Sequence, residues 1–191
     1  FTRSRGDSDI WYRLNKDKDG YDYLGTHVDD ILVVAKRPQI IFEELKAFYT
    51  FKDTEAPRYH LGVDYIQKKG ADGRIRYHLG SKTYVEEAIR KVKSLLEEAG
   101  RKIPYPTKCP MDKDLKPELD TSRFCNAGEH RLYMQLMGIF LWIVRLGRVD
   151  LGFPISSLSR FSALPRIGHL EHLEKVFGYL LKFPDKQIPV N

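Results

Sequence analysis

Two adjacent carboxylates, Asp29 and Asp30, are the residues of this sequence best suited to chemistry. They lie in the stretch THVDDILVV, between the polar residues Thr26 and His27 and an apolar run that begins at Ile31. Adjacent carboxylates repel each other unless a cation or helix dipole neutralises them, and tight hairpin turns favour Asn-Gly or Asp-Gly over Asp-Asp. Their hard oxygen atoms would bind magnesium, with manganese possible, rather than zinc. A solvated turn that happens to be acidic is the alternative.

A second acidic segment lies just upstream. Asn15, Asp17 and Asp19 followed by Gly20 match the opening of an EF-hand calcium loop. The twelfth position, which should be a bidentate Glu, is Thr26, and strands rather than helices are expected on either side. We therefore predict a hairpin turn here and not a calcium site.

Histidines and cysteines offer weaker metal sites. His169 and His172 stand three apart in an expected helix with no third ligand near them in sequence, so capping or packing is the better interpretation. Cys109 and Cys125 are 16 residues apart and form no CxxC pair. This pattern favours a reduced intracellular protein without structural zinc.

The elements that must position the acidic pair are strands. Residues 9–14, 21–28 and 31–36 have strand-like composition, and the pair falls at the link between the last two. Pro38 begins a predicted helix to about Tyr49, with Ile41, Leu45 and Phe48 at helical spacing. Residues 58–69 and 74–80 predict a hairpin around the turn GADG. The aromatic residues of these strands, with Trp11 and Trp142, are expected in the core.

The second half of the chain predicts helices. The first begins at Ser81, with Thr83 and Glu86 as a capping box, and ends at Gly100. Residues 102–126 are Pro-rich and charged, which indicates a linker or surface crossing. Further helices are expected at about 129–146, 151–161 and 169–183. The fold class is therefore α+β, with an antiparallel-sheet region at 1–80 and a helical region at 81–191.

Composition and charge limit the possible classes. The chain has 191 residues, 42% hydrophobic and 30% charged, which is typical of a soluble globular protein. Its longest apolar run, residues 136–144, is far shorter than the roughly 20 residues of a membrane-spanning helix. Residues 1–65 carry 10 basic and 12 acidic side chains, whereas residues 66–191 carry 22 and 14. The basic part could lie along a polyanion such as nucleic acid.

The ordered set of motifs resembles the reverse transcriptases of copia-type (Pseudoviridae) LTR retrotransposons. THVDDILVVAK is similar to the family's Y-x-D-D motif. Other similar segments are DSDIWYR, RYHLGVDY, GSKTYVEEAIRKV, KCPMD and the long stretch from RLYMQLMGIFLW through VRLGRVD and LSRF to Pro165, His169 and Tyr179-Leu180. The resemblance covers nearly the whole chain. It implies the C-terminal palm and thumb portion of such an enzyme, with a partial palm at 1–80 and a thumb-like part at 81–191.

The resemblance implies RNA-directed DNA polymerisation by a two-metal mechanism. Asp29 matches the catalytic metal ligand and Asp30 the less essential second aspartate, with magnesium as cofactor. His27 and Val28 would help to position the nucleotide, and Leu61 and Gly62 the primer. The basic helix would contact the nucleic-acid backbone through Lys82, Arg90, Lys91 and Lys93. A solvated face is the alternative for these four residues.

The resemblance also implies partners and a location. These are an RNA template, a DNA primer, deoxynucleoside triphosphates, and the rest of a polyprotein with its upstream palm and fingers and downstream ribonuclease H, inside a cytoplasmic virus-like particle. No membrane association is expected.

Three departures from the family pattern bear on activity. His27 replaces the motif's Tyr, and Val149 replaces the Pro of R-P-D-I while Arg148 and Asp150 remain. The family's other catalytic Asp, which precedes an Ala-Phe-Leu, does not occur in this sequence. We therefore expect the isolated chain to be inactive, and a non-catalytic nucleic-acid-binding remnant of a decayed element is the alternative function.

Overall fold

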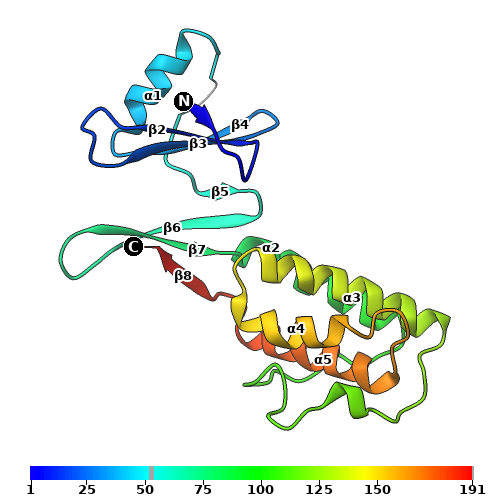
Figure 1. The fold of residues 1–191 in the computed structure, drawn as a ribbon. Coiled ribbons are helices and arrows are strands. Elements are labelled where there is room, and N and C mark those ends of the chain that lie inside the picture. Colours follow the sequence, from blue (N-terminus) through cyan, green and yellow to red (C-terminus); the bar gives the residue numbers. More distant parts are fainter. Residues whose placement is uncertain (52–53, 191) are drawn as a thin grey trace. The chain divides into compact units, whose positions relative to one another are not determined.

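A computed structural model of the chain describes residues 1–51 and 54–190. It combines helices with two antiparallel four-stranded sheets, so the predicted α+β class is confirmed (Figure 1). The chain forms two compact units, residues 1–57 and residues 58–191. Within the described parts of the chain, no helix is long and apolar enough to cross a membrane.

The first unit is a sheet with one helix. The strands run in the order β1-β2-β3-β4 and every pair is antiparallel. The three predicted strands are present with slightly shorter bounds, and the two-residue β1 was not predicted. The elements are β1 (Thr2–Arg3), β2 (Ile10–Leu14), β3 (Tyr21–His27), β4 (Asp30–Val34) and α1 (Pro38–Lys46).

Helix α1 ends earlier than the apolar spacing predicts. Its last turn tightens as the backbone N–H groups of Phe48 and Tyr49 both donate to the carbonyl oxygen of Leu45. Phe48 is therefore 81% exposed instead of packed. Ile41 is the residue of α1 that is fully buried.

The two faces of the first sheet differ in burial. Alternate residues of a strand point to opposite faces, and on one face Leu24 and Asp22 are buried. On the other face Tyr12 pairs with Tyr23 in register and both are exposed, as is Tyr21. The prediction that the aromatic residues of these strands lie in the core is therefore wrong for these three tyrosines, because the described residues cover one face only.

The second unit begins with another sheet and continues into helices. Strands β5 to β8 pair in order, and the predicted hairpin around GADG is confirmed as β6–β7. The turn at Leu61-Gly62 divides the predicted strand 58–69 into β5 and β6, and β8 was not predicted. The strands are β5 (Tyr59–His60), β6 (Val63–Lys69), β7 (Ile75–Gly80) and β8 (Gln187–Val190).

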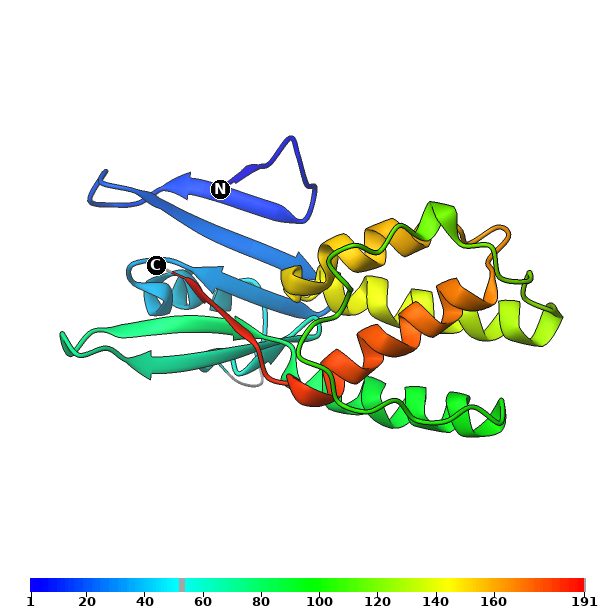
Figure 2. The ribbon, with the colours of Figure 1, turned by 90° about the horizontal axis from the view of Figure 1, so that it is seen from below.

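The core of the second unit lies among four helices that pack side by side (Figure 2). Tyr133, Phe140 and Phe177 are among its fully buried side chains. The predicted helices are confirmed with end shifts of a few residues. The helical elements are α2 (Lys82–Glu98), η1 (Pro117–Leu119), α3 (Ala127–Arg145), η2 (Val149–Leu151), α4 (Gly152–Ser159) and α5 (Ile167–Lys182).

The start of α2 is capped by a different residue from the one predicted. Ser81 is the N-cap, but its side chain makes no capping hydrogen bond, so the predicted capping box is wrong. Instead the carboxylate of Asp64 in β6 accepts hydrogen bonds from Thr83 N (3.0 Å) and Thr83 Oγ1 (2.7 Å). A carboxylate at a helix N-terminus also complements the helix dipole. The cap thus joins the β6–β7 hairpin to α2.

This connection explains where the two units divide. The sequence analysis places residues 58–80 with the first sheet, whereas in the structure they group with the helices. The physical reason is that β6 caps α2 through Asp64, and β7 pairs with β8 at the end of the chain, as Leu79 opposite Ile188 illustrates.

Residues 102–126 form a strap along α5 and not a free linker. Thr107 N donates to Gly178 O (3.1 Å), and Cys125 N donates to Pro165 O (2.9 Å). At Gly178 a Cβ atom would lie 2.5 Å from Tyr105 O, so only glycine permits this approach. Polar backbone groups of an irregular segment need such partners when the segment packs on a helix.

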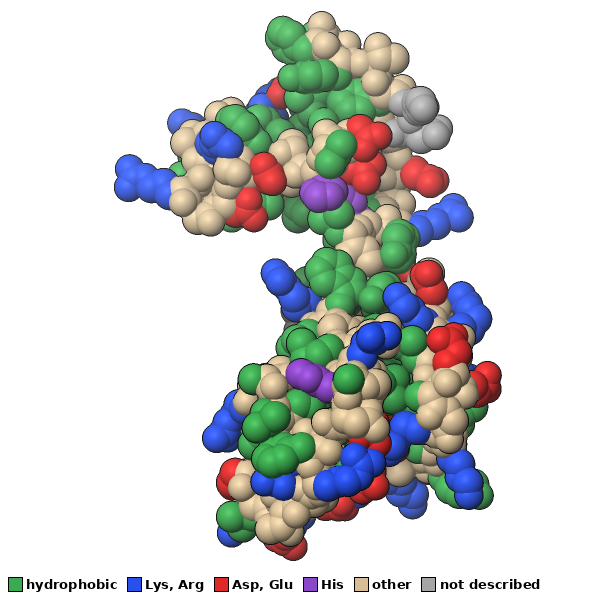
Figure 3. All heavy atoms as spheres, turned by 90° about the vertical axis from the view of Figure 1, so that its right-hand side faces the viewer, with side chains coloured by type: hydrophobic (Ala, Val, Ile, Leu, Met, Phe, Trp, Pro, Cys, Tyr) green, Lys and Arg blue, Asp and Glu red, His purple; other side chains and the backbone are tan. Residues whose placement is uncertain are grey.

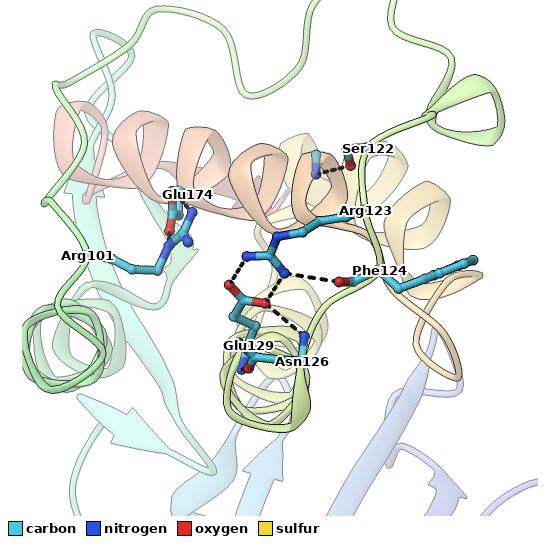
Figure 4. Close-up of polar contacts among 8 residues, drawn as sticks. Arg101, Ser122, Arg123, Phe124, Asn126, Glu129 and Glu174 are labelled. Atoms are coloured by element: carbon cyan, nitrogen blue, oxygen red, sulfur yellow. Dashed lines mark hydrogen bonds and ion pairs between the residues drawn. The ribbon is translucent and has the colours of Figure 1, made fainter.

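Helix α3 begins with a capping box that an arginine of the strap reinforces (Figure 4). Asn126 Oδ1 accepts from Glu129 N (3.0 Å), and Glu129 Oε2 accepts from Asn126 N (2.8 Å). Arg123 donates to both carboxylate oxygens of Glu129, at 2.8 and 2.7 Å. The bonds from Arg123 and from Asn126 N lower the pKa of Glu129 from 4.5 to about 2.

Replacing this carboxylate tests the cap. We expect Glu129→Gln to lower the free energy of unfolding by about 1 kcal/mol near neutral pH, because the amide accepts hydrogen bonds but cannot pair with Arg123. The folded-state pKa lies below the unfolded one, so this stability is present above pH 4.5 and is lost as the pH falls toward about 2. Denaturant titrations of both proteins over this range, with exposed Glu97→Gln of α2 as control, measure the difference. A difference that persists at the low end of the range would contradict the assignment.

Candidate functional site

The acidic pair lies at the tip of the β3–β4 hairpin. His27 and Asp30 are the last paired residues, so the two-residue turn consists of Val28 and Asp29. The sequence suggests that the two carboxylates share the turn, but in the structure they do not. Asp29 is the second residue of the turn, and Asp30 is the first residue of β4. All four residues are exposed.

The backbone of this turn is strained. Val28 has a φ of 55° and is 96% exposed. A positive φ is a genuine outlier for a β-branched residue, and the first position of such a two-residue turn usually holds glycine. Unfavourable backbone conformations of this kind cluster at functional sites. The strain is thus a second feature, independent of the charges, that marks the tip as a candidate site.

The pair has the donor atoms that a magnesium site would need. Carboxylates are the ligands that magnesium prefers, and an exposed tip leaves room for bound water and substrate phosphates. In the described part of the chain, however, no group of three His, Cys, Asp or Glu side chains is placed to hold a metal ion. Among the described residues the tip therefore supplies two candidate carboxylate ligands, Asp29 and Asp30.

Leu61 and Gly62 form a second two-residue turn, between β5 and β6 of the other unit. Both residues have positive φ, 50° and 86°. A Cβ atom at Gly62 would lie 2.9 Å from Cδ2 of Leu146, which follows α3. Glycine is thus required twice here, by the backbone conformation and by the contact. Leu61 is half exposed, so the turn presents a side chain to solvent.

The four basic residues assigned to α2 are exposed, but they do not form a positive face. Lys82, Arg90, Lys91 and Lys93 share the helix with an equal number of glutamates, Glu86, Glu87, Glu97 and Glu98. Lys82 lies 3.8 Å from Glu86. Acidic and basic side chains are also interspersed on the face of this unit that Figure 3 shows. The net charge of α2 is therefore close to zero, and the helix would attract a polyanion only weakly.

The outward face of α3, unlike that of α2, carries basic and apolar side chains without acidic ones, and this face was not predicted. Its exposed side chains recur at helical spacing, and residues 130–149 contain no Asp or Glu. Trp142 is 46% exposed, so its expected place in the core is wrong. The absence of Asp and Glu from residues 130–149 was the sequence feature that could have indicated this face. The face comprises Arg131, Met134, Leu141, Trp142 and Arg145.

The weaker metal candidates have structural roles. Asp17 and Asp19, in the calcium-like segment, both accept a hydrogen bond from Lys36, in a turn closed by Asn15 N donating to Gly20 O. The predicted hairpin turn is confirmed. Hydrogen bonds from Arg37 and then Lys36 lower the pKa of Asp17, as expected for a paired carboxylate.

His169 is a capping residue, as predicted. It is 2% exposed, its Nδ1 accepts from Arg166 N (3.1 Å), and its Nε2 lies 2.8 Å from Pro117 O. Since Nδ1 accepts, Nε2 must carry the proton and donate it to the carbonyl. Both ring nitrogens are thus occupied, and Phe161 stacks on the ring. Neither nitrogen is available for a metal ion.

Comparisons with known proteins relate the chain to transposon proteins. It is 29% identical over 185 residues to a putative protein of transposon Ty5-1 from Saccharomyces cerevisiae. The aligned region covers 94% of this chain and 54% of that protein. It is 23% identical over 169 residues to a retrovirus-related Pol polyprotein from transposon RE1 of Arabidopsis thaliana, covering 87% and 10%. No family model and no solved structure matches. The chain spans about half of the first relative, and the similarities support a protein derived from a retrotransposon Pol polyprotein.

Proposed function

We propose that this chain is the palm and thumb portion of a copia-type retrotransposon reverse transcriptase, an RNA-directed DNA polymerase. The observation that carries the proposal is the pair Asp29 and Asp30 at an exposed and strained hairpin tip, in a chain similar to transposon proteins. Neither feature suffices alone: an acidic turn can be inert, and a transposon polyprotein contains more than one activity.

In this proposal the tip carboxylates would hold magnesium, and the bound ion would supply charge stabilisation for nucleotidyl transfer from a triphosphate to the primer 3′-hydroxyl. Asp29, which is exposed in the turn, would be the main ligand. Asp30 is fixed by its pairing with His27 and supports the site from the first position of β4. The strained Val28 and exposed His27 flank the position of the incoming nucleotide.

The second unit would hold the primer and duplex. The Leu61–Gly62 turn supplies a protruding side chain on a rigid backbone, which suits contact with the end of a primer strand. Lys82, Arg90, Lys91 and Lys93 of α2 contribute phosphate contacts. The acid-free face of α3 contributes more, because Arg131 and Arg145 have no acidic neighbours along their helix face. The rest of the polyprotein would supply the remaining metal ligand, and the complex would act in a cytoplasmic virus-like particle.

A non-catalytic nucleic-acid-binding remnant is the second candidate. The absence of a third metal ligand among the described residues and the acid-free face of α3 favour it. The two functions differ in one respect. A remnant would bind duplex without needing Asp29 and Asp30, whereas a polymerase also requires both a metal ion and these carboxylates.

The test is primer extension on an RNA template with magnesium. We expect the polyprotein containing this chain to extend the primer, and the 191-residue chain alone to bind a primer–template duplex without extending it. Manganese should substitute for magnesium and chelation should stop extension. Duplex binding by both proteins with extension by neither would favour the remnant, and extension by the isolated chain would show that its metal site is complete.

A further inference from the structure

Arg148 is buried although it is charged. Its side chain is 1% exposed, and its Nε and Nη2 donate to the two carboxylate oxygens of Asp150 at 3.0 Å each. Its Nη1 is also buried and has no hydrogen-bond partner among the described residues. Buried ion pairs seldom add net stability over apolar packing, and their best-attested role is to select one arrangement. This pair is therefore better suited to fixing the backbone between α3 and α4 than to stabilising the fold.

Asp150 extends the contact to two other segments. The hydroxyl of Tyr179 in α5 donates a hydrogen bond to Asp150 Oδ2 (2.9 Å). Lys186 Nζ donates to Tyr179 Oη (2.6 Å) and lies 3.5 Å from Asp150 Oδ2. Burial raises the pKa of Asp150, but the bonds from Arg148 and Tyr179 and the charge of Lys186 outweigh it and keep the pKa below its usual value. Asp150 is thus a charged acceptor that joins the α3–α4 junction, α5 and the segment before β8.

The α3–α4 junction is also the support of the Leu61–Gly62 turn. Leu146 is 6% exposed and its δ-methyl groups face Gly62, within 3 Å or so of where a Cβ would lie. The next residue, Gly147, has a φ of 101° and lies against Ile188 of β8. The position of Leu146 therefore depends on the same short segment that Arg148 and Asp150 hold.

We propose that Arg148, Asp150 and Tyr179 are positioning residues for the Leu61–Gly62 turn. They fix the backbone that carries Leu146. The side chain of Leu146 packs against Gly62 so closely that a Cβ atom there would clash, and it therefore limits movement of the turn toward α3. The structural part of this inference stands by itself. Its consequence for catalysis rests on the proposed function, in which the turn holds the end of the primer.

The experiment compares two buried tyrosine hydroxyls of the same unit. Tyr179→Phe removes the bond to Asp150 and keeps the ring. Tyr133→Phe is the matched control, because the Tyr133 hydroxyl is also buried and donates to Leu158 O (2.6 Å) outside this network. Amide hydrogen exchange of the segment Arg58–Tyr65 is measured in the polyprotein. We expect about tenfold faster exchange there in Tyr179→Phe and no change in Tyr133→Phe.

Kinetics supply the second measurement. In Tyr179→Phe and Arg148→Lys we expect the KM for the incoming nucleotide to rise about tenfold, since small misplacements of reacting groups cost this much or more. KM does not depend on the fraction of folded enzyme, so a purely structural role would leave it unchanged, as in Tyr133→Phe.

The outcomes separate the inference from the proposed function. Equal exchange of Arg58–Tyr65 in Tyr179→Phe and Tyr133→Phe would overturn the inference, whatever the activity. Faster exchange with an unchanged nucleotide KM would overturn its catalytic part. Faster exchange in a polyprotein that never extends primers would support the positioning network and overturn the polymerase assignment instead.

Discussion

Asp29→Asn, introduced into the polyprotein, is expected to reduce primer extension by about a thousandfold or more while duplex binding is kept. The amide retains one oxygen but loses the negative charge that would hold a divalent cation in the proposed function. A loss of several kcal/mol of transition-state stabilisation corresponds to such a factor. Duplex affinity should be unchanged or slightly tighter, since a negative charge near the phosphates is removed. Steady-state extension and equilibrium binding of a labelled duplex measure the two effects.

Two matched variants interpret this result. Asp30→Asn removes the same charge one residue later and should cause a smaller loss, because Asp30 belongs to β4 and not to the turn. Asp114→Asn removes an exposed carboxylate of the strap and should change neither measurement. Extension that survives Asp29→Asn at near its normal rate would show that the hairpin tip does not hold the catalytic metal.

Gly62→Ala is expected to destabilise the second unit by about 2–5 kcal/mol. The backbone conformation at φ +86° costs an L-residue about 1–2 kcal/mol, and the added methyl must displace Leu146, which overpacking data place at about 1–3 kcal/mol. Chemical denaturation of the chain measures the loss. Both terms arise from this glycine's position and not from helix or strand propensity.

Gly73→Ala separates the two terms. Gly73 also has a positive φ, 77°, but a Cβ there would meet no atom within 4 Å. We expect it to show the conformational cost alone, so the difference between the two variants measures the contact with Leu146. A double variant with Leu146→Ala should show coupling between the sites. Equal losses in Gly62→Ala and Gly73→Ala would mean that Leu146 does not hold the turn.

Much of the secondary structure could be predicted because it depends on local patterns. The strand at 21–28 and the helices near 129–146 and 169–183 appear within a few residues of their predicted bounds, since side-chain period and turn residues determine them. The failures are contacts between segments. Asp64 caps α2 in place of Thr83 and Glu86, and the strap at 102–126 packs on α5, which no local pattern records.

The same division applies to the candidate site. The sequence alone placed two carboxylates at the β3–β4 hairpin, because residue identity and strand period are local. The strained conformation of Val28, by contrast, became visible in the folded backbone alone.

Arg148, Asp150 and Tyr179 show most clearly what only the fold could decide. Their motifs are recognisable in the sequence, yet nothing local indicates that one carboxylate accepts from both Arg148 and Tyr179 beside the support of Gly62. Such contacts depend on how the end of α3 meets α5 and β8. Packing of apolar surfaces far apart in the chain sets that geometry, and local sequence preferences do not encode it.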